Sequence, residues 1–223
     1  MELIFKGEVY EALPDNGGLI FSYFDGHTPE GDLMISFKML GTETKEPADV
    51  HRDVYKLSKF GANYAKVLKH CQNYVTAKAV HLNEGKVFVV NIDGTALLFD
   101  GDGEPVWQGI LKYKNRIPAD ITVAADGLWG TFPDLDCLVR FNAATMRNEL
   151  RLGKKGELFN APKGIFAEGD CLYVSSFEGK KVLKVNLKTY EITELYKFSE
   201  EVYSYFRLHD REFALLKSGI YEI

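Results

Sequence analysis

The sequence has few cysteines, and nothing in their spacing indicates a disulfide framework. Its 223 residues include Cys71, Cys137 and Cys171, an odd number without a Cys-x-x-Cys pair. Secreted frameworks use more cysteines in even number, so we expect three free thiols and a reducing compartment. The N-terminal residues show neither a basic leader nor a long apolar run, and no apolar stretch approaches the length of a membrane span. These absences predict a cytoplasmic protein with no membrane partner.

The chain also lacks an excess of positive charge. It contains 27 lysines and arginines against 32 aspartates and glutamates, a formal net charge of −5. A nucleic-acid-binding surface needs a basic patch or stripe. We therefore expect no nucleic-acid partner.

Recognisable catalytic and metal-binding motifs are missing as well. There is no Gly-x-Ser-x-Gly nucleophile elbow and no His-x-His or His-Glu-x-x-His spacing for zinc. Glycine-rich stretches such as residues 100–103 and 153–156 are typical of turns. The histidines are scattered along the chain, at His27, His51, His70, His81 and His209.

What the sequence does contain is an internal repeat. Residues 118–129 align with residues 162–173 at a constant offset of 44, and residues 85–89 and 211–215 extend the register at offsets of 41. A period of this length indicates a repeat architecture. Within each unit, β-branched and aromatic runs alternate with turn signals such as Asp93-Gly94.

Each repeat reads as four strands, named A to D from the inside outwards. The first unit is predicted at residues 18–24, 33–40, 54–60 and 65–70, although residues 46–64 also come nearest to a helical pattern. The second is predicted at 77–81, 86–91, 96–99 and 106–111, and the third at 120–124, 127–132, 137–142 and 148–152. The fourth is predicted at 164–167, 171–176, 182–187 and 193–198, and the last at 203–208, 212–217 and 220–223.

The two ends of the chain complement each other. The last unit lacks its D strand, while residues 2–10 form a strand-like segment with no A, B or C before it. Placing this segment as the outer strand of the last unit closes a ring and removes two exposed edges. The sequence therefore predicts an all-β fold, a single five-bladed β-propeller domain of four-stranded blades over residues 1–223. A β-sandwich of similar strand count is the alternative, but it gives no reason for the period.

The repeat resembles a known family. Residues 159–165, Phe-Asn-Ala-Pro-Lys-Gly-Ile, followed by residues 169–174, are similar to the repeat of NHL and SMP-30/gluconolactonase-like propellers, and so are residues 118–121 with 126–129. The resemblance covers the second to fourth units and implies the fold. It leaves function open, because that superfamily includes lactonases, lyases and binding modules.

The resemblance also allows a test for a metal. Lactonases of that family hold a divalent cation with Glu, Asn and Asp side chains at the inner ends of A strands. Asn160 corresponds to one region of that site, but Lys163 stands where the family often has a liganding Asn, and a cation opposes a metal there. We expect no metal and no other cofactor.

The resemblance implies that a ligand site lies at the mouth of the central channel, where the D–A and B–C loops meet. The long loop of residues 41–53 is a candidate lid. Arg116 and Lys163, beside the aligned Pro118 and Pro162, are expected to face one space and to favour an anion. The polar residues predicted to converge at the mouth are Arg116, Asp120, Asp134, Asn160, Lys163, Glu178 and His51.

Two functions remain open. The first is a non-catalytic binding propeller that recognises a partner protein or a small polar ligand, an anion included, at the channel mouth. The alternative is a hydrolase or lyase acting on a carbohydrate or lactone, with carboxylates such as Asp120 and Asp134 as acid and base. Aspartates beside a turn also cap backbone N–H groups, which is the structural interpretation of Asp134 and Asp136.

Overall fold

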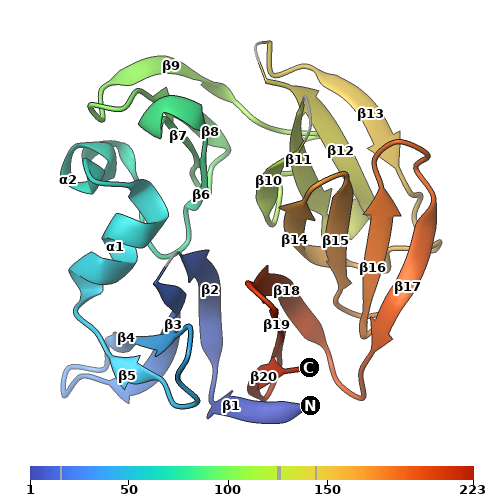
Figure 1. The fold of residues 1–223 in the computed structure, drawn as a ribbon. Coiled ribbons are helices and arrows are strands. Elements are labelled where there is room, and N and C mark those ends of the chain that lie inside the picture. The colour runs from blue at the N-terminus through green and yellow to red at the C-terminus, as the bar shows by residue number, and fades with distance from the viewer. Residues whose placement is uncertain (16, 125–126, 144) are drawn as a thin grey trace.

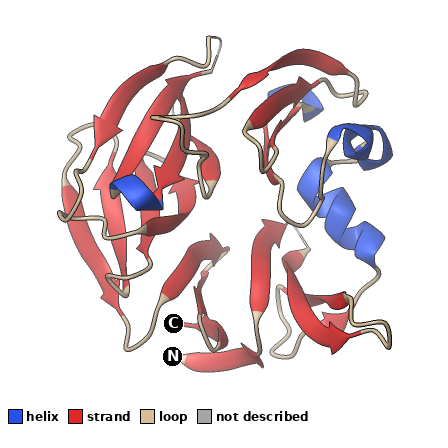
Figure 2. Cartoon of the chain, turned by 180° about the vertical axis from the view of Figure 1, so that it is seen from behind, coloured by secondary structure: helices blue, strands red, loops and turns tan. Residues whose placement is uncertain are grey.

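The structure is a computed structural model that describes residues 1–15, 17–124, 127–143 and 145–223. Five four-stranded antiparallel sheets surround a common centre (Figures 1 and 2). The chain is therefore a five-bladed β-propeller, as the repeat predicts.

The blades follow one another along the chain, each running from its inner to its outer strand. Blade one is β2 (Val9–Asp15), β3 (Gly18–His27), β4 (Leu33–Gly41) and β5 (Ala48–Asp49). Blade two is β6 (Lys78–His81), β7 (Val87–Val90), β8 (Thr95–Phe99) and β9 (Pro105–Ile110). Blade three is β10 (Ile121–Ala124), β11 (Gly127–Phe132), β12 (Cys137–Asn142) and β13 (Asn148–Leu152).

Blade four is β14 (Pro162–Glu168), β15 (Cys171–Ser176), β16 (Lys181–Asn186) and β17 (Ile192–Lys197). Blade five combines both ends of the chain: β18 (Val202–Leu208), β19 (Arg211–Leu216), β20 (Gly219–Glu222) and β1 (Glu2–Lys6). Short 3₁₀ turns, η2 (Asn83–Gly85) and η3 (Pro133–Leu135), lie between strands.

The ring closes through the N-terminal strand, as expected. β1 pairs antiparallel with β20, with Phe5 opposite Ile220 and Lys6 opposite Gly219. The backbones approach so closely there that a Cβ at Gly219 would lie 1.9 Å from the Phe5 carbonyl oxygen, and Gly219 has a φ of +150°. Only glycine fits such a position.

The predicted extent of this strand, residues 2–10, is wrong at its end. β1 stops at Lys6, Gly7 turns the chain with a φ of +152°, and β2 then begins blade one. The first blade is therefore shifted by one strand from the prediction. The segment expected as its inner strand is the second strand β3, and the segment expected next is the third strand β4.

The strands expected at residues 54–60 and 65–70 are helical instead. They form α1 (Arg52–Phe60), α2 (Tyr64–Val67) and the 3₁₀ turn η1 (Leu68–His70). His51 caps α1, because its Nδ1 accepts a hydrogen bond from the Asp53 N–H. Gly61, with a φ of +77°, ends the helix by donating its N–H to the Leu57 carbonyl. One face of α1 buries Tyr55, Lys59 and Phe60, and this face docks the helix against the propeller.

Most neighbouring blades pack through apolar side chains. The cluster between blades three and four, for example, contains Trp129, Leu138, Ile165 and Leu172. Between blades one and two, α1 contacts β2, β3, β4 and β6, and the core divides into one cluster on each side of the helix.

All three cysteines are free thiols. Within the described ranges, no helix is both long and apolar enough to span a membrane.

Candidate functional site

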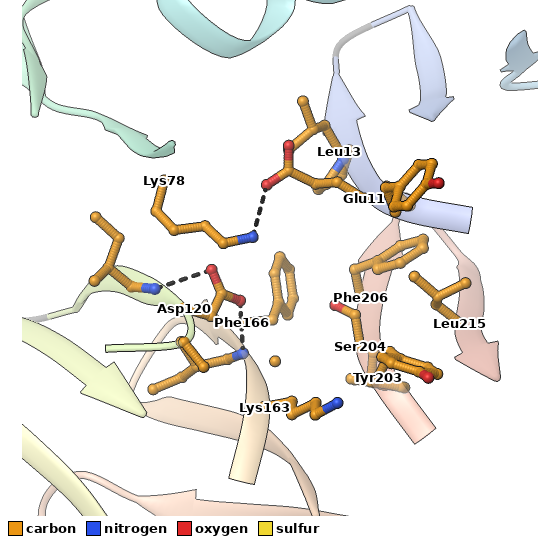
Figure 3. Close-up of a pocket in the computed structure, with 18 of the residues that line it drawn as sticks. Glu11, Leu13, Lys78, Asp120, Lys163, Phe166, Tyr203, Ser204, Phe206 and Leu215 are labelled. Atoms are coloured by element: carbon orange, nitrogen blue, oxygen red, sulfur yellow. Dashed lines mark hydrogen bonds and ion pairs between the residues drawn. The ribbon is translucent and has the colours of Figure 1, made fainter. Parts of the chain in front are cut away.

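The five inner strands converge on a central cavity of about 220 Å³. Each inner strand, or the residue next to it, contributes one polar side chain to the ring seen in Figure 3: Glu11, Lys78, Asp120, Lys163 and Ser204. Acidic and basic side chains alternate around the first four positions of this ring. Phe166, Phe206 and Leu215 supply apolar surface between them.

Glu11 is the centre of a buried ionic network. Its Oε1 accepts a hydrogen bond from Lys78 Nζ at 3.1 Å, and its Oε2 accepts from the Tyr55 hydroxyl and from Lys59 Nζ on α1. Lys59 also donates to the Val75 carbonyl at 3.1 Å and is only 2% exposed.

The network fixes the charge of its members. Burial acts to raise the pKa of Glu11, but the positive charges of Lys59 and Lys78, with the hydrogen bonds from Lys59 and Tyr55, outweigh it and lower the pKa to about 2. Burial lowers the pKa of Lys59 against the opposing attraction of Glu11. Glu11 is therefore a permanent carboxylate at neutral pH.

Asp120 has both carboxylate oxygens engaged by backbone amides. Its Oδ1 accepts from its neighbour Ile121 at 2.9 Å, and its Oδ2 accepts from Ile165 of blade four at 3.0 Å. Thr131 reinforces the same junction by donating its hydroxyl to the Lys163 carbonyl at 2.7 Å. Burial raises the pKa of Asp120, and the charge of nearby Lys78 opposes the rise. Asp120 thus ties blade three to blade four.

Lys163 differs from these groups because its ammonium has no oxygen partner among the described residues. Its Nζ lies 3.6 Å from the ring centroid of Phe177 and 4.6 Å from that of Tyr203, two rings that meet edge-on. Burial lowers the pKa of Lys163, and the charge of Glu178 opposes the shift. Lys163 lines the central cavity and also a groove outside it.

This groove, of about 640 Å³, brings together four of the predicted mouth residues: Arg116, Asp134, Lys163 and Glu178. Lys155 and Asp136 also line it, so cations and carboxylates are equal in number. The structure does not leave two unpaired cations facing each other, because Arg116 Nε lies 3.3 Å from Asp134 Oδ2, with both side chains largely exposed. Arg116 is therefore paired with a carboxylate, whereas Lys163 lies over two aromatic rings.

The other predicted residues lie apart from the groove. Asn160 lines neither the groove nor the central cavity, and its carbonyl accepts from the Ser176 hydroxyl at 3.2 Å. His51 caps α1 and lines a separate groove on blade one. The loop that carries His51 leads into α1, which packs between blades one and two, and His51 lines neither the central cavity nor the groove of Lys163.

The two carboxylates proposed as an acid–base pair do not share a cavity. Asp120 lines the central cavity, whereas Asp134 lines the outer groove. Asp136 has the capping role considered for it, because its oxygens accept from the backbone N–H groups of Gly156 at 2.8 Å and Ala161 at 2.7 Å. Across the described ranges, no three His, Cys, Asp or Glu side chains gather in a geometry that could hold a metal ion.

Sequence reasoning missed Glu11, Tyr55, Lys59 and Lys78. Glu11 lay just after the segment assigned to the closing strand, residues 2–10, and was placed in no strand, whereas the segment with Tyr55 and Lys59 was assigned to a strand. Lys78 was placed correctly on an inner strand but carried no motif. The sequence signal that could have identified these residues is a lysine or glutamate inside an otherwise apolar element, because a buried charge needs a partner.

No protein-family model matches the chain, and no curated protein matches it. Solved structures do resemble it. A streptogramin B lyase structure has a TM-score of 0.60 at 15% identity, over 100% of this chain and 85% of the other. Virginiamycin B lyase from Staphylococcus aureus has a TM-score of 0.54 at 13% identity, over 100% and 86%. The computationally designed Ika4 protein has a TM-score of 0.50 at 11% identity, over 66% and 88%. Likeness at such low identity establishes the β-propeller fold.

Proposed function

We propose that this protein is a non-catalytic binding propeller that takes a small polar ligand with an anionic group at the mouth of its central cavity. Lys163 is the anion-binding residue of this proposal. Lys163 lines both the cavity and the groove, so we expect a ligand at either position to lie near its ammonium.

The observation that carries the proposal is the unshared charge of Lys163. An ammonium group has three donors, and none of them meets an oxygen among the described residues. Phe177 and Tyr203 stabilise the cation on one side through their ring faces. A carboxylate or phosphate oxygen on the other side adds the charge-assisted hydrogen bond that this lysine lacks.

The charges around the cavity agree with an anionic ligand. Two lysines, Lys78 and Lys163, line the cavity with two carboxylates, Glu11 and Asp120. Lys59 on α1 adds one further positive charge beside Glu11. Burial also raises the pKa of Asp120, whereas the pKa of Glu11 is lowered. Of the two carboxylates, Asp120 is therefore the one that is protonated more readily. An anion lowers the electrostatic energy of this cavity, whereas a cation raises it.

The same geometry argues against an acid–base role for these carboxylates. Glu11 accepts from two lysines and a tyrosine and has a pKa of about 2, far below the range useful for proton transfer at neutral pH. Asp120 is engaged by two backbone amides. A hydrolase or lyase acting on a carbohydrate or lactone therefore remains the second candidate. The streptogramin B and virginiamycin B lyases, which share this fold, are its support. Membership of the NHL and SMP-30-like propeller superfamily likewise stays a prediction.

Binding to simple anions tests the proposal. Isothermal calorimetry and NMR shifts are recorded with acetate and with inorganic phosphate, using choline as a cationic comparison. We expect an anion to bind the parent protein, and Lys163→Met to weaken binding by about ten- to a hundredfold, because a hydrogen bond to a charged group contributes about 1.5–3 kcal/mol.

Lys114→Met is the matched control. Lys114 also lies over an aromatic ring, with Nζ 5.7 Å from the Tyr113 centroid, but it lines neither the cavity nor the groove. Binding that is absent from the parent, or equally strong in Lys163→Met, contradicts the proposal. Lactone or glycoside turnover by the parent instead favours the enzyme.

A further inference from the structure

Blade one has an incomplete outer edge. Its outer strand β5 has two residues, whereas the outer strands β9, β13, β17 and β1 have five or six. β5 pairs only with Lys38 and Met39 of β4, and the chain then leaves the sheet for α1 (Figure 1). The first half of β4, the third strand of the blade, therefore has no outer neighbour among the described strands and forms a free sheet edge.

The backbone of this edge is free to pair. Val50 N–H donates to the Phe37 carbonyl on the outer side of β4. Because backbone groups alternate between the two sides of a strand, Ile35 and Leu33 also direct theirs outward, where no described residue pairs with them. Leu33 and Met34 are 61% and 38% exposed. Unprotected apolar edges of this kind pair readily with another strand.

Unpaired charges of opposite sign flank the edge. Arg52 lines a groove of about 780 Å³ at the Phe37 end, whose other charged residues are Asp25 and the paired Lys38 and Asp49. Glu30 and Asp32 lie in the exposed turn that precedes Leu33. None of Arg52, Glu30 and Asp32 forms an ion pair within the described parts of the chain.

We infer that this edge pairs with the same edge of a second copy of the protein, forming a two-fold symmetric dimer. Antiparallel pairing of the free residues sets Leu33 opposite the partner's Ile35, and the two-fold axis passes between the Met34 side chains. In this register the acidic turn at one end of β4 meets the Arg52 groove of the other copy, and the reverse contact forms at the other end. The surface is self-complementary in backbone, apolar contact and charge, which is what a two-fold interface requires.

Sedimentation velocity over a range of concentrations tests the inference. We expect the parent to show a monomer–dimer equilibrium. Arg52→Glu and Asp32→Arg should each raise the dimer dissociation constant about tenfold or more, because each places like charges together at two symmetric contacts. The double variant Arg52→Glu/Asp32→Arg should restore dimerisation, since it exchanges the two signs. Lys154→Glu, a charge reversal on a loop of blade three, is the control and should leave the equilibrium unchanged.

Hydrogen exchange and a proline variant locate the contact. The amides of Leu33 and Ile35 should become protected as concentration rises, and Leu33→Pro should abolish the dimer by removing an outward donor. A thermal melt checks that each variant folds. A parent that stays monomeric at its highest soluble concentration overturns the inference, as does a dimer that persists in both charge reversals. The inference is also overturned if the parent does not self-associate and the amides of Leu33 and Ile35 become protected only when another peptide is added.

Discussion

The junction between blades one and two is filled by a helix and a buried ionic network, whereas the junction between blades three and four is filled by apolar side chains. At the first, Lys59 of α1 and Lys78 of β6 both reach Glu11 of β2. At the second, Trp129 and Leu138 pack against Ile165 and Leu172, and Asp120 adds a hydrogen bond across the gap.

The difference shows two ways of closing the same ring. Apolar contact is spread over many atoms and tolerates moderate change. Buried ions must be desolvated, and they stabilise the fold only while every partner remains in place. The first junction should therefore depend sharply on single charges, and the second should depend on volume and shape.

Removing the charge of Glu11 should produce the largest effect. Glu11→Gln leaves Lys59 and Lys78 without their carboxylate in a buried site, which we expect to reduce the free energy of unfolding by about 3–5 kcal/mol. Urea denaturation of the parent and the variant measures the loss. Glu168→Gln removes an exposed partner of Arg207 at 2.6 Å and should cost about 1 kcal/mol or less.

A second variant separates charge from packing at the same site. Glu11→Gln/Lys59→Met removes both a carboxylate and its buried lysine, so we expect it to be more stable than Glu11→Gln alone. If the double variant loses as much free energy of unfolding as Glu11→Gln and Lys59→Met lose in sum, the junction does not depend on an uncompensated charge.

Acid should weaken the same junction without a mutation. The pKa of Glu11 is lowered from 4.5 to about 2 on folding, so its contribution is fully present above the unfolded pKa and is lost as pH falls through the folded one. We expect a loss on the order of 3 kcal/mol between about pH 5 and pH 2. Urea midpoints across this range should show a shallower decline for Glu11→Gln/Lys59→Met, and an identical decline would contradict the assignment to Glu11.

The regular half of the propeller could be predicted from the sequence to within a residue or two. The second strands of blades three and four, β11 and β15, match the prediction at both ends, because strand patterning, turn residues and the period all agree there. The helix α1 lies within residues 46–64, which come nearest to a helical pattern, but its residues were assigned to a strand because Val54, Tyr55, Leu57 and Phe60 also fit one. His51 and Gly61 at its ends, and the docking of Lys59 on Glu11, decide the conformation.

The candidate site divides in the same way. Lys163, Arg116, Asp134 and Glu178 could be placed together because each lies in or beside a loop at a fixed position of the repeat. The network around Glu11 could not, because its partners lie 48 and 67 residues away in the sequence. Contacts over such separations depend on ring closure and on a helix that interrupts the repeat.

At the junction of blades three and four, removing a carboxylate charge should have the smallest effect. Asp120→Asn keeps one carbonyl acceptor but loses the second, so either Ile121 or Ile165 keeps an unpaired N–H, at about 1–3 kcal/mol. Part of this loss is offset at neutral pH, because burial raises the pKa of Asp120 above 3.8. Because the folded pKa is raised, Asp120 contributes favourably to stability at low pH, and this contribution is lost as pH rises through that pKa. Asparagine has no charge to bury, so it avoids this loss at neutral pH.

Urea denaturation measures the change in the free energy of unfolding for Asp120→Asn, and hydrogen exchange at the Ile165 amide localises it. Thr131→Val, which removes the hydroxyl donor to the Lys163 carbonyl, is the neutral comparison. A loss as large as that of Glu11→Gln would show that the second junction also depends on a buried charge.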